Sequence, residues 1–384
     1  MKKTLAFRSQ RRRSYFTEQP GESNPKVQIP WVSQPNCSPR GIERHFGHRG
    51  HFSVNGIGEN LLGIRGLGVT YMPAKGVAVR ALDDISLDVR RAEVLGVLGE
   101  SGSGKSTLAN AILQVLPRNA KSVKGGEVLF GDRNLLALTE SEMRAIRGCE
   151  ISLIPQDPAL SLNPVMTVGT QVAEVLRAHF RLSSRQRRER VNELLAEVGF
   201  EDPSAICGAY PHQLSGGQRQ RVVIAQGVAC RPKLLIADEP TSKLDTLLRS
   251  EIVSLLSRIR QTHGTTILLI SHDPTLFSTF ADRIALMYAG RVVEIGKCSE
   301  VLSRPLHPYT RALVQVAISA MDATAGLKSP FAAIHGDPPD SATFVTGCRF
   351  EPRCVDRMEA CTQRVPREIA HEPARYVSCL KYGE

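Results

Sequence analysis

The sequence predicts an α/β protein built on a mostly parallel β-sheet, with antiparallel strands near the start of the ordered region. Short apolar runs alternate with stretches that fit helices, at residues 94–98, 151–154, 234–237, 266–270 and 284–287. Continuous apolar strands separated by helices are typical of a parallel sheet that is covered on both faces. Alternating apolar residues from 61 to 69 and from 82 to 89 fit antiparallel strands instead.

Length and composition limit the classes of protein to consider. The chain has 384 residues, of which 42% are hydrophobic and 23% are charged, close to the averages for soluble globular proteins. The length predicts one large domain with appended segments. No apolar run approaches the roughly 18 residues that a membrane-spanning helix requires, so we expect that the chain does not span a membrane itself.

The basic character of the chain is concentrated at its start. Residues 1–58 contain ten Lys or Arg against three acidic side chains, which accounts for +7 of the formal net charge of +11. This segment is rich in Arg, Ser, Pro and Gly and has no apolar periodicity, so we predict a disordered basic leader. Attraction to anionic lipid or nucleic acid is one interpretation of its charge, and a merely solvated extension is the other.

The strongest motif lies between the run at 94–98 and a helical pattern. It matches the phosphate-binding loop G-x-x-x-x-G-K-[ST], and its residues are Gly99, Glu100, Ser101, Gly102, Ser103, Gly104, Lys105, Ser106 and Thr107. Glycines let backbone N–H groups surround triphosphate oxygens, which also face the positive end of the next helix. We expect Lys105 near the terminal phosphates, Ser106 on Mg²⁺ and Thr107 also near the phosphates.

A pair of carboxylates ends the apolar run at 234–237. Asp238 and Glu239 follow it directly, and carboxylates at the carboxyl end of a strand can face a nucleotide bound to an open α/β sheet. Asp238 suits the binding of Mg²⁺, and Glu239 suits a general base that polarises the attacking water. The alternative is a charged strand end on the surface.

A third motif precedes this strand by about twenty residues. Leu214 is followed by Ser215, Gly216, Gly217 and Gln218, and a serine with two glycines at a helix N-terminus forms another anion-binding surface. The segment closely resembles the signature sequence of ABC-type ATPases. The resemblance implies that these residues contact the γ-phosphate of an ATP held by a second subunit, and that a dimer is therefore required.

Further segments extend this resemblance over roughly residues 61 to 300. Gln156 looks like the Q-loop glutamine, which senses Mg²⁺ and the γ-phosphate, Asp245 lies in a D-loop-like segment, and His272 looks like the switch histidine. Tyr71 is the candidate for stacking on adenine, with an ordinary strand tyrosine as the alternative. The resemblance implies an ATPase domain at 59–300 with an inserted helical subdomain at about 168–227.

Two positions within the ATPase-like region depart from the family pattern. Lys243 stands where the D-loop usually has alanine, which places a long cation near the expected dimer interface. Ala92 stands where glycine usually precedes the glutamate that is Glu93 here. We expect the first departure to affect communication between ATP sites, and the second to matter little.

Other segments resemble the ATPases of dipeptide, oligopeptide and nickel importers. These are residues 156–164 and 307–313, together with an extension at 301–384 that contains Cys348, Cys354, Cys361 and Cys379. The clustering of these four cysteines favours a metal site over disulfides. Four thiolates suit an iron–sulfur cluster or zinc, and the resemblance favours a four-iron four-sulfur cluster. The irregular spacing, and Arg349 in place of the usual proline, leave reduced unligated thiols as the alternative.

The resemblance as a whole implies an ATP-hydrolysing subunit, with ATP and Mg²⁺ as ligands, that energises the import of short peptides. The expected partners are a second ATPase subunit, a related but distinct chain, with two transmembrane permease subunits and an extracytoplasmic solute-binding protein. The expected location is peripheral, on the cytoplasmic face of the bacterial inner membrane. Nickel, glutathione or another small solute is the alternative cargo. An ABC-type ATPase acting on DNA or the ribosome is the alternative class, but we expect no nucleic-acid partner.

Overall fold

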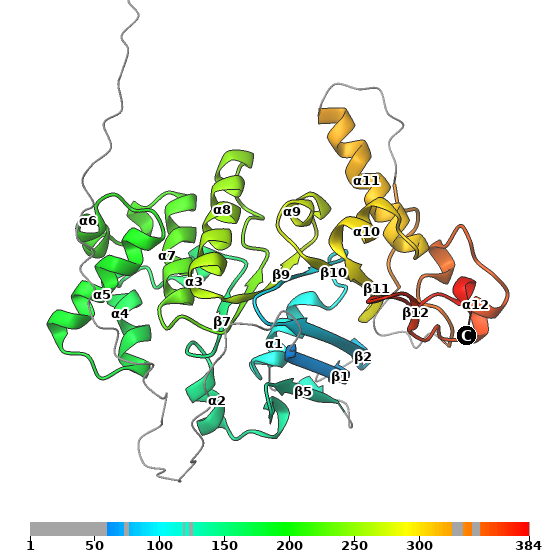
Figure 1. The fold of residues 1–384 in the computed structure, drawn as a ribbon, viewed down its shortest axis with the longest axis horizontal. Helices are drawn as coiled ribbons and strands as arrows, with labels where there is room; N and C mark the ends of the chain where they lie inside the picture. The colour runs from blue at the N-terminus through cyan, green and yellow to red at the C-terminus, as the bar shows by residue number, and fades with distance from the viewer. Residues whose placement is uncertain are drawn as a thin grey trace, which may run out of the picture. The chain divides into compact units, whose positions relative to one another are not determined.

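The computed structural model describes residues 60–72, 77–117, 120–122, 126–324, 333–339 and 346–383. The predicted leader at 1–58 lies outside these residues. The described part of the chain contains two β-sheets and a set of helices, which Figure 1 shows as a ribbon.

The larger sheet has eight strands in the order β12-β13-β11-β10-β3-β9-β8-β7. Five of them run parallel to one another: β3 (Val94–Leu98), β7 (Ile151–Ile154), β8 (Leu234–Asp238), β9 (Thr266–Ser271) and β10 (Arg283–Tyr288). Each corresponds to one of the apolar runs in the sequence, within one residue at either end. The predicted parallel sheet is therefore confirmed.

This parallel core is buried on both faces. Leu235 and Ala237 of β8 belong to one hydrophobic cluster, whereas Leu234 and Ile236 belong to another. Successive side chains of a strand point to opposite faces of the sheet, so the two clusters are its two covers. Burial on both faces explains why these strands are apolar at most positions rather than at every second one.

The smaller sheet is antiparallel and contributes to the second of these clusters. Strands β2, β1, β5 and β6 lie in that order, and β4 pairs with the far end of β1. Their bounds are β1 (Asn60–Tyr71), β2 (Val79–Arg90), β4 (Ala120–Ser122), β5 (Glu127–Phe130) and β6 (Arg133–Asn134). The antiparallel strands predicted from the alternating residues are confirmed by the pairing of β1 with β2.

Helices gather beside strand β7, at one edge of the larger sheet (Figure 1). They are α3 (Pro158–Ser161), α4 (Val168–His179), α5 (Ser184–Glu197), α6 (Pro203–Gly208), a 3₁₀ turn η2 (Pro211–Gln213) and α7 (Gly216–Val228). Helix α4 packs against α5, α6 and α7, and α7 also contacts β7. Residues 168–227, which the sequence marks as helical, hold four of these helices.

The remaining helices of the described chain connect the strands. They are α1 (Lys105–Ile112), η1 (Leu135–Ala137), α2 (Glu140–Ile146), α8 (Thr246–His263), α9 (Pro274–Ser278), α10 (Cys298–Ser303), α11 (Pro308–Thr324), η3 (Glu351–Arg353), α12 (Ala360–Gln363) and η4 (Leu380–Tyr382). None of the described helices combines the length with the apolar character that crossing a bilayer requires.

The C-terminal segment joins the larger sheet, which the sequence patterns did not predict. Strand β11 (Arg291–Lys297) pairs antiparallel with β10 and with β13 (Arg375–Val377), and β12 (Ile369–Glu372) completes the edge. The red end of the chain in Figure 1 therefore lies at the edge opposite β7. Short strands of this kind carry too few residues for their periodicity to be recognised.

A buried ion pair fixes this edge. The Arg375 guanidinium donates to the Glu294 carboxylate at 2.9 Å, and their side chains are 1% and 0% exposed. Glu294 also accepts the backbone N–H groups of Leu306 and His307, at 3.1 and 2.9 Å. One carboxylate thus gathers β13 and the start of α11 onto β11.

Two departures from the family pattern have structural consequences. Arg349 donates to the carbonyl of Ala289 and pairs with Asp83 at 2.5 Å, so it attaches the extension to β2. Ala92 has a φ of 55°, in the left-handed region that favours glycine. This backbone conformation explains why the family usually has glycine at this position, and it strains the backbone of Ala92.

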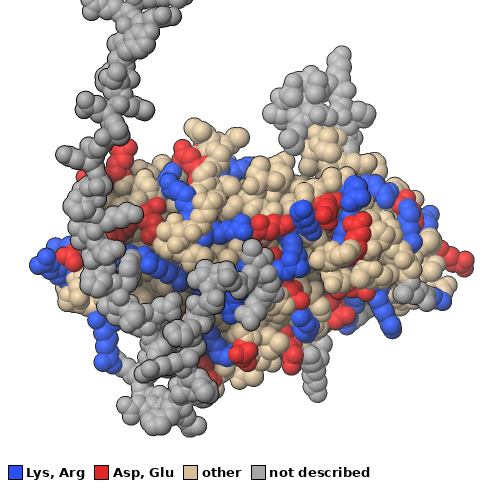
Figure 2. Space-filling model, viewed as in Figure 1, with Lys and Arg blue, Asp and Glu red and all other residues tan. Residues whose placement is uncertain are grey.

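Charges of both signs are interspersed over the described residues visible in Figure 2. Many of them pair, as Arg133 and Lys233 do with Glu150, both at 2.8 Å. Exposed pairs of this kind contribute little to stability.

We predict that Arg375→Met lowers the free energy of unfolding by about 3–5 kcal/mol, because it leaves the Glu294 carboxylate buried without its cation. Denaturant unfolding of the full chain measures this. Arg367→Met is the control, since Arg367 is exposed and its replacement should change little. A loss below about 1 kcal/mol for Arg375→Met would contradict the role given to the pair.

Candidate functional site

The predicted site residues converge because neighbouring parallel strands end at the same edge of the sheet. The phosphate-loop motif follows β3, and His272 follows β9. Glu239 follows β8, and Gln156 lies two residues beyond β7. Since β3, β9, β8 and β7 are consecutive neighbours, these segments lie side by side at the carboxyl edge, where open α/β sheets bind ligands.

The phosphate-loop motif forms a tight turn into helix α1. Gly102 and Gly104 have φ values of 80° and 101°, which side chains other than glycine rarely adopt. Lys105 opens α1, and its ammonium donates to the carbonyls of Gly99 and Glu100 at 2.7 and 2.8 Å. Burial lowers the pKa of Lys105, against the opposing charges of the nearby carboxylates. The loop is thus a preformed anion cradle with a buried cation.

Asp238 has the properties of a magnesium-binding carboxylate. It is buried, and its Oδ1 has no hydrogen-bond partner among the described residues. The Ser106 hydroxyl interacts with the same carboxylate, and burial raises the pKa of Asp238. A buried, unpartnered carboxylate oxygen next to a hydroxyl fits Mg²⁺, which takes oxygen ligands and usually retains several waters.

Glu239 lies between the other two predicted catalytic residues. Its Oε2 accepts from the Gln156 amide at 2.9 Å, and its Oε1 lies 3.0 Å from Nδ1 of His272. The glutamate is 13% exposed and the histidine 54%. Glu239 has a φ of 47°, an unusual conformation for a residue with a side chain and one that clusters at functional sites.

Tyr71 lies beside the phosphate loop, at the end of β1. Its hydroxyl is 3.2 Å from the Thr107 hydroxyl of α1, and its ring is partly exposed. Thr107 is therefore bonded to Tyr71 as well as adjacent to the loop. The position suits a ring that stacks on a base held above α1.

The remaining motif residues lie at the N-termini of helices α7 and α8, outside the phosphate loop. Ser215 caps α7, its hydroxyl accepting from the Gln218 N–H while the Gln218 side chain returns to the Ser215 N–H. Gly216 is exposed, Gly217 is buried against Leu248, and Asp245 caps α8. Within the described residues, no hydrogen bond or ion pair joins Ser215–Gln218 or Asp245 to residues 99–107. The phosphate loop and the exposed N-terminus of α7 thus share no hydrogen bond or ion pair among the described residues.

Sequence reasoning missed two contacts that link the site to other segments. The Lys243 ammonium binds the Asp157 carboxylate, so the unusual lysine joins the D-loop-like segment to the Q-loop-like segment. Glu100 is bound by Arg353, 253 residues later in the chain. No local sequence pattern signals either contact, because each depends on the tertiary fold.

The four C-terminal cysteines lie in one neighbourhood. Their thiols are free, and burial, reinforced by the other three thiols, raises the pKa of Cys348 to about 11. The Cys348 N–H also donates to the Cys361 carbonyl at 2.7 Å. Among the described residues, no three His, Cys, Asp or Glu side chains stand in a ready-made metal-binding arrangement. The four thiols are thus close together, but in the described residues they do not form a metal-binding arrangement.

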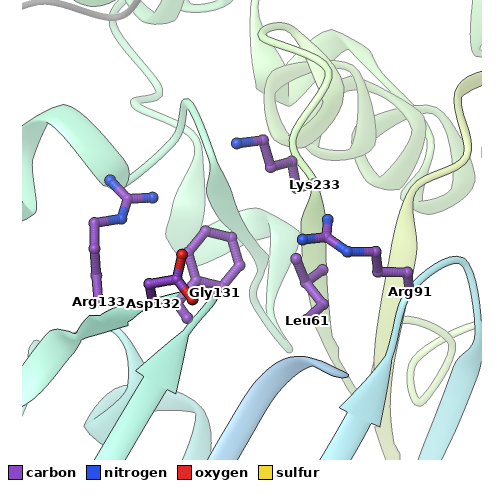
Figure 3. Close-up of a pocket in the computed structure, with 7 residues that line it drawn as sticks. Leu61, Arg91, Gly131, Asp132, Arg133 and Lys233 are labelled. Carbon is purple, nitrogen blue, oxygen red and sulfur yellow. The ribbon is translucent and has the colours of Figure 1, made fainter. Parts of the chain in front are cut away.

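A pocket lies away from these residues (Figure 3). It is lined by Leu61, Arg91, Phe130, Gly131, Asp132, Arg133 and Lys233. Arg91 and Lys233 precede β3 and β8, so the pocket lies at the amino ends of the strands, opposite the phosphate loop. Since Arg133 and Lys233 already pair with Glu150, much of its positive charge is neutralised.

Comparison with known proteins gives matches to both parts of the chain. A family model described as ABC transporter matches residues 82–242, and one described as oligopeptide/dipeptide transporter, C-terminal region, matches residues 293–361. The chain is 40% identical to the probable peptide ABC transporter ATP-binding protein y4tR of Sinorhizobium fredii, over 84% of this chain and 96% of that protein. It is 38% identical to the dipeptide transport ATP-binding protein DppD of Bacillus subtilis, over 84% and 94%.

Among solved structures, the chain is similar to the ATP-binding cassette MJ0796, determined as a dimer in a post-hydrolysis state bound to ADP and Pi. The TM-score is 0.55 at 30% identity, and the similarity covers 62% of this chain and 98% of that chain. The similarity thus extends over nearly all of that cassette but over only part of this chain.

We predict that Gly104→Ala distorts the phosphate loop, because a Cβ there would lie 2.5 Å from the Ala81 carbonyl at a φ of 101°. The expected loss is about 1–3 kcal/mol in the free energy of unfolding, with weaker ATP binding in calorimetric titration. Gly208→Ala is the control, since nothing lies within 4 Å of its Cβ position. Unchanged ATP affinity for Gly104→Ala would count against the loop as the phosphate site.

Proposed function

Because this chain belongs to the ATP-binding proteins of ABC transporters, we propose that it hydrolyses ATP to drive the import of short peptides through a membrane transporter. The observation that carries the proposal is that the Glu239 carboxylate forms hydrogen bonds with Gln156 and His272 beside a phosphate loop. Both the cassette and the C-terminal region have relatives with transport functions.

ATP binding uses the phosphate loop and the residues around it. Backbone N–H groups of residues 99–107 surround the phosphates, and Lys105 turns from the loop carbonyls to the phosphate oxygens. Ser106 and Asp238 hold Mg²⁺ together with Gln156, and Tyr71 packs on the adenine. Mg²⁺ bound there neutralises charge on the phosphates. The buried lysine loses two carbonyl contacts and gains charge-assisted ones, which favour binding.

Hydrolysis requires a water placed in line with the terminal phosphate. Glu239 accepts a proton from this water, while the hydrogen bonds from Gln156 and His272 orient its carboxylate. His272 is far more exposed than Glu239, so it is free to turn toward the γ-phosphate. The two partners of Glu239 thus link its position to the state of the nucleotide.

A second subunit completes the site. Ser215, Gly216, Gly217 and Gln218 present an exposed helix N-terminus, which we assign to the γ-phosphate of the opposing subunit, with Asp245 at the interface between the two. The dimeric MJ0796 structure supports such pairing. We propose a related but distinct chain as the partner, with two permease subunits and an extracytoplasmic binding protein, at the cytoplasmic face of the inner membrane.

Peptides are the proposed cargo because the relatives y4tR and DppD are named for peptide and dipeptide transport. Nickel, glutathione or another small solute is the alternative within the same family. Thermal stabilisation of the cognate binding protein by peptides, and not by nickel or glutathione, distinguishes them. The transport relatives span most of the chain, which favours this class over an ATPase that acts on DNA or the ribosome.

We predict that Glu239→Gln reduces kcat for ATP hydrolysis by the assembled transporter at least about 100-fold, because the amide cannot accept the proton of the water. ATP binding should persist. Glu201→Gln is the control, since Glu201 is exposed and lies in the α5–α6 connection. Hydrolysis at the wild-type rate by Glu239→Gln would show that another group is the base.

The extension adds a second proposal, a metal site formed by Cys348, Cys354, Cys361 and Cys379. Four thiols in one neighbourhood match the donor set of an iron–sulfur cluster or of zinc, and we favour a four-iron four-sulfur cluster. Such a cluster, when bound, would cross-link the segments that carry the four cysteines. The chain's contribution is to keep the four thiols close together and at least partly buried.

We predict that anaerobically purified protein contains iron and acid-labile sulfide, and that Cys361→Ser removes most of both. Elemental analysis and visible absorption measure the content. Cys207→Ser is the control, because Cys207 bonds to Asn192 instead. Stoichiometric zinc in place of iron would assign the other metal, and metal-free protein would leave the thiols unligated.

A further inference from the structure

The second residue of the phosphate loop, Glu100, is held by side chains from the distant C-terminal part of the chain. Its N–H donates to the Tyr309 hydroxyl at 2.9 Å. Its carboxylate accepts both Nη groups of Arg353, at 2.8 and 3.1 Å. Its carbonyl accepts from Lys105 at 2.8 Å. The carbonyl also accepts from the Ser103 N–H at 3.2 Å. Every polar group of Glu100 is thus bound, and two of its four partners, Tyr309 and Arg353, lie outside the match at 82–242.

Arg353 is built into this contact rather than resting on the surface. Its side chain is 4% exposed, against 24% for Glu100. Its remaining donor bonds go to the Tyr288 hydroxyl at 3.3 Å and to the carbonyls of His335 and Ile334, at 3.0 and 3.4 Å. A bidentate guanidinium–carboxylate pair fixes orientation as well as distance. Arg353 therefore holds the loop residue in one place.

The charge of Glu100 has a consequence for ATP. This carboxylate is near enough to act on the Lys105 ammonium electrostatically, and Lys105 is the phosphate-binding cation. An unneutralised carboxylate at this point repels the negative phosphates and competes for the lysine. Arg353 supplies the compensating charge from outside the cassette.

We propose that Arg353 is a positioning residue for ATP: it neutralises Glu100 and fixes the phosphate loop, so that ATP affinity depends on the C-terminal extension. This inference rests on the proposed ATPase function. It adds a role for the extension at the nucleotide site itself. Because Arg353 directly precedes Cys354, the role also connects the loop with the cysteine cluster.

The test measures the Kd for MgATP with the full chain, by calorimetric titration. Arg353→Gln should weaken binding about tenfold, because it leaves the negative charge of Glu100 without a partner near the phosphates. Adding Glu100→Gln to Arg353→Gln should restore most of the affinity, because the repelling charge is then gone. Arg353→Lys should retain more affinity than Arg353→Gln. Arg357→Gln is the matched control, since Arg357 lies in the same extension and is 67% exposed.

The outcomes are distinguishable. Wild-type affinity in Arg353→Gln overturns the inference. Equal losses in Arg353→Gln and in the double variant, with equal falls in Tm, also overturn it, because a merely structural arginine gives no rescue. Should Arg353→Gln fail to fold, Arg353→Lys is measured in its place. This variant keeps the positive charge, so a loss of affinity for MgATP as large as tenfold would overturn the inference. Failure of the wild-type chain to bind MgATP contradicts the proposed function instead.

Discussion

The parallel alignment of β3, β9, β8 and β7 is the constraint on which the site depends. Parallel strands deliver their carboxyl ends to one edge, so four segments far apart in the sequence place their polar residues together. Antiparallel strands would send alternate ends to opposite edges. The two hydrophobic clusters that cover the sheet hold this alignment, and the catalytic geometry is thus a consequence of core packing.

The same alignment sustains an unfavourable backbone conformation at Glu239. A φ of 47° costs about 1–3 kcal/mol for a residue with a side chain. The Glu239 N–H bonds to the Ile270 carbonyl of β9 at 2.9 Å, which extends the β8–β9 pairing past the strand end. The neighbouring strand therefore fixes the direction in which the carboxylate emerges, toward Gln156 and His272.

The C-terminal extension is part of the ATPase rather than an appendage. Arg375 with Glu294 anchors its strands to the sheet, Arg349 with Asp83 attaches it to the antiparallel sheet, and Arg353 with Glu100 reaches the phosphate loop. Each contact pairs an arginine of the extension with an acid of the cassette. Such pairs are strong where they are buried and bidentate.

The sequence predicted the parts of this structure that depend on local patterns. The five parallel strands were predictable because each contains a short run that is mostly apolar. The phosphate loop was predictable from its motif, and the positive φ values of Gly102 and Gly104 show why glycine stands at both positions. The convergence of Gln156, Glu239 and His272 was implied by the family resemblance, and the structure shows the contacts between them. Short strands β12 and β13 were missed because three or four residues show no clear period. The pairs Lys243–Asp157 and Arg353–Glu100 were missed because they join residues that only the fold brings together.

The central claim is that one chain supplies half of each ATP site, with the phosphate loop on one side and Ser215–Gln218 on the other. The most direct test is the rate of ATP hydrolysis per chain as a function of protein concentration, with and without the partner ATPase subunit. The account predicts that the dilute chain alone binds MgATP but hydrolyses it slowly, and that the rate per chain rises steeply on pairing. A full rate in dilute monomer, independent of concentration and partner, would contradict it.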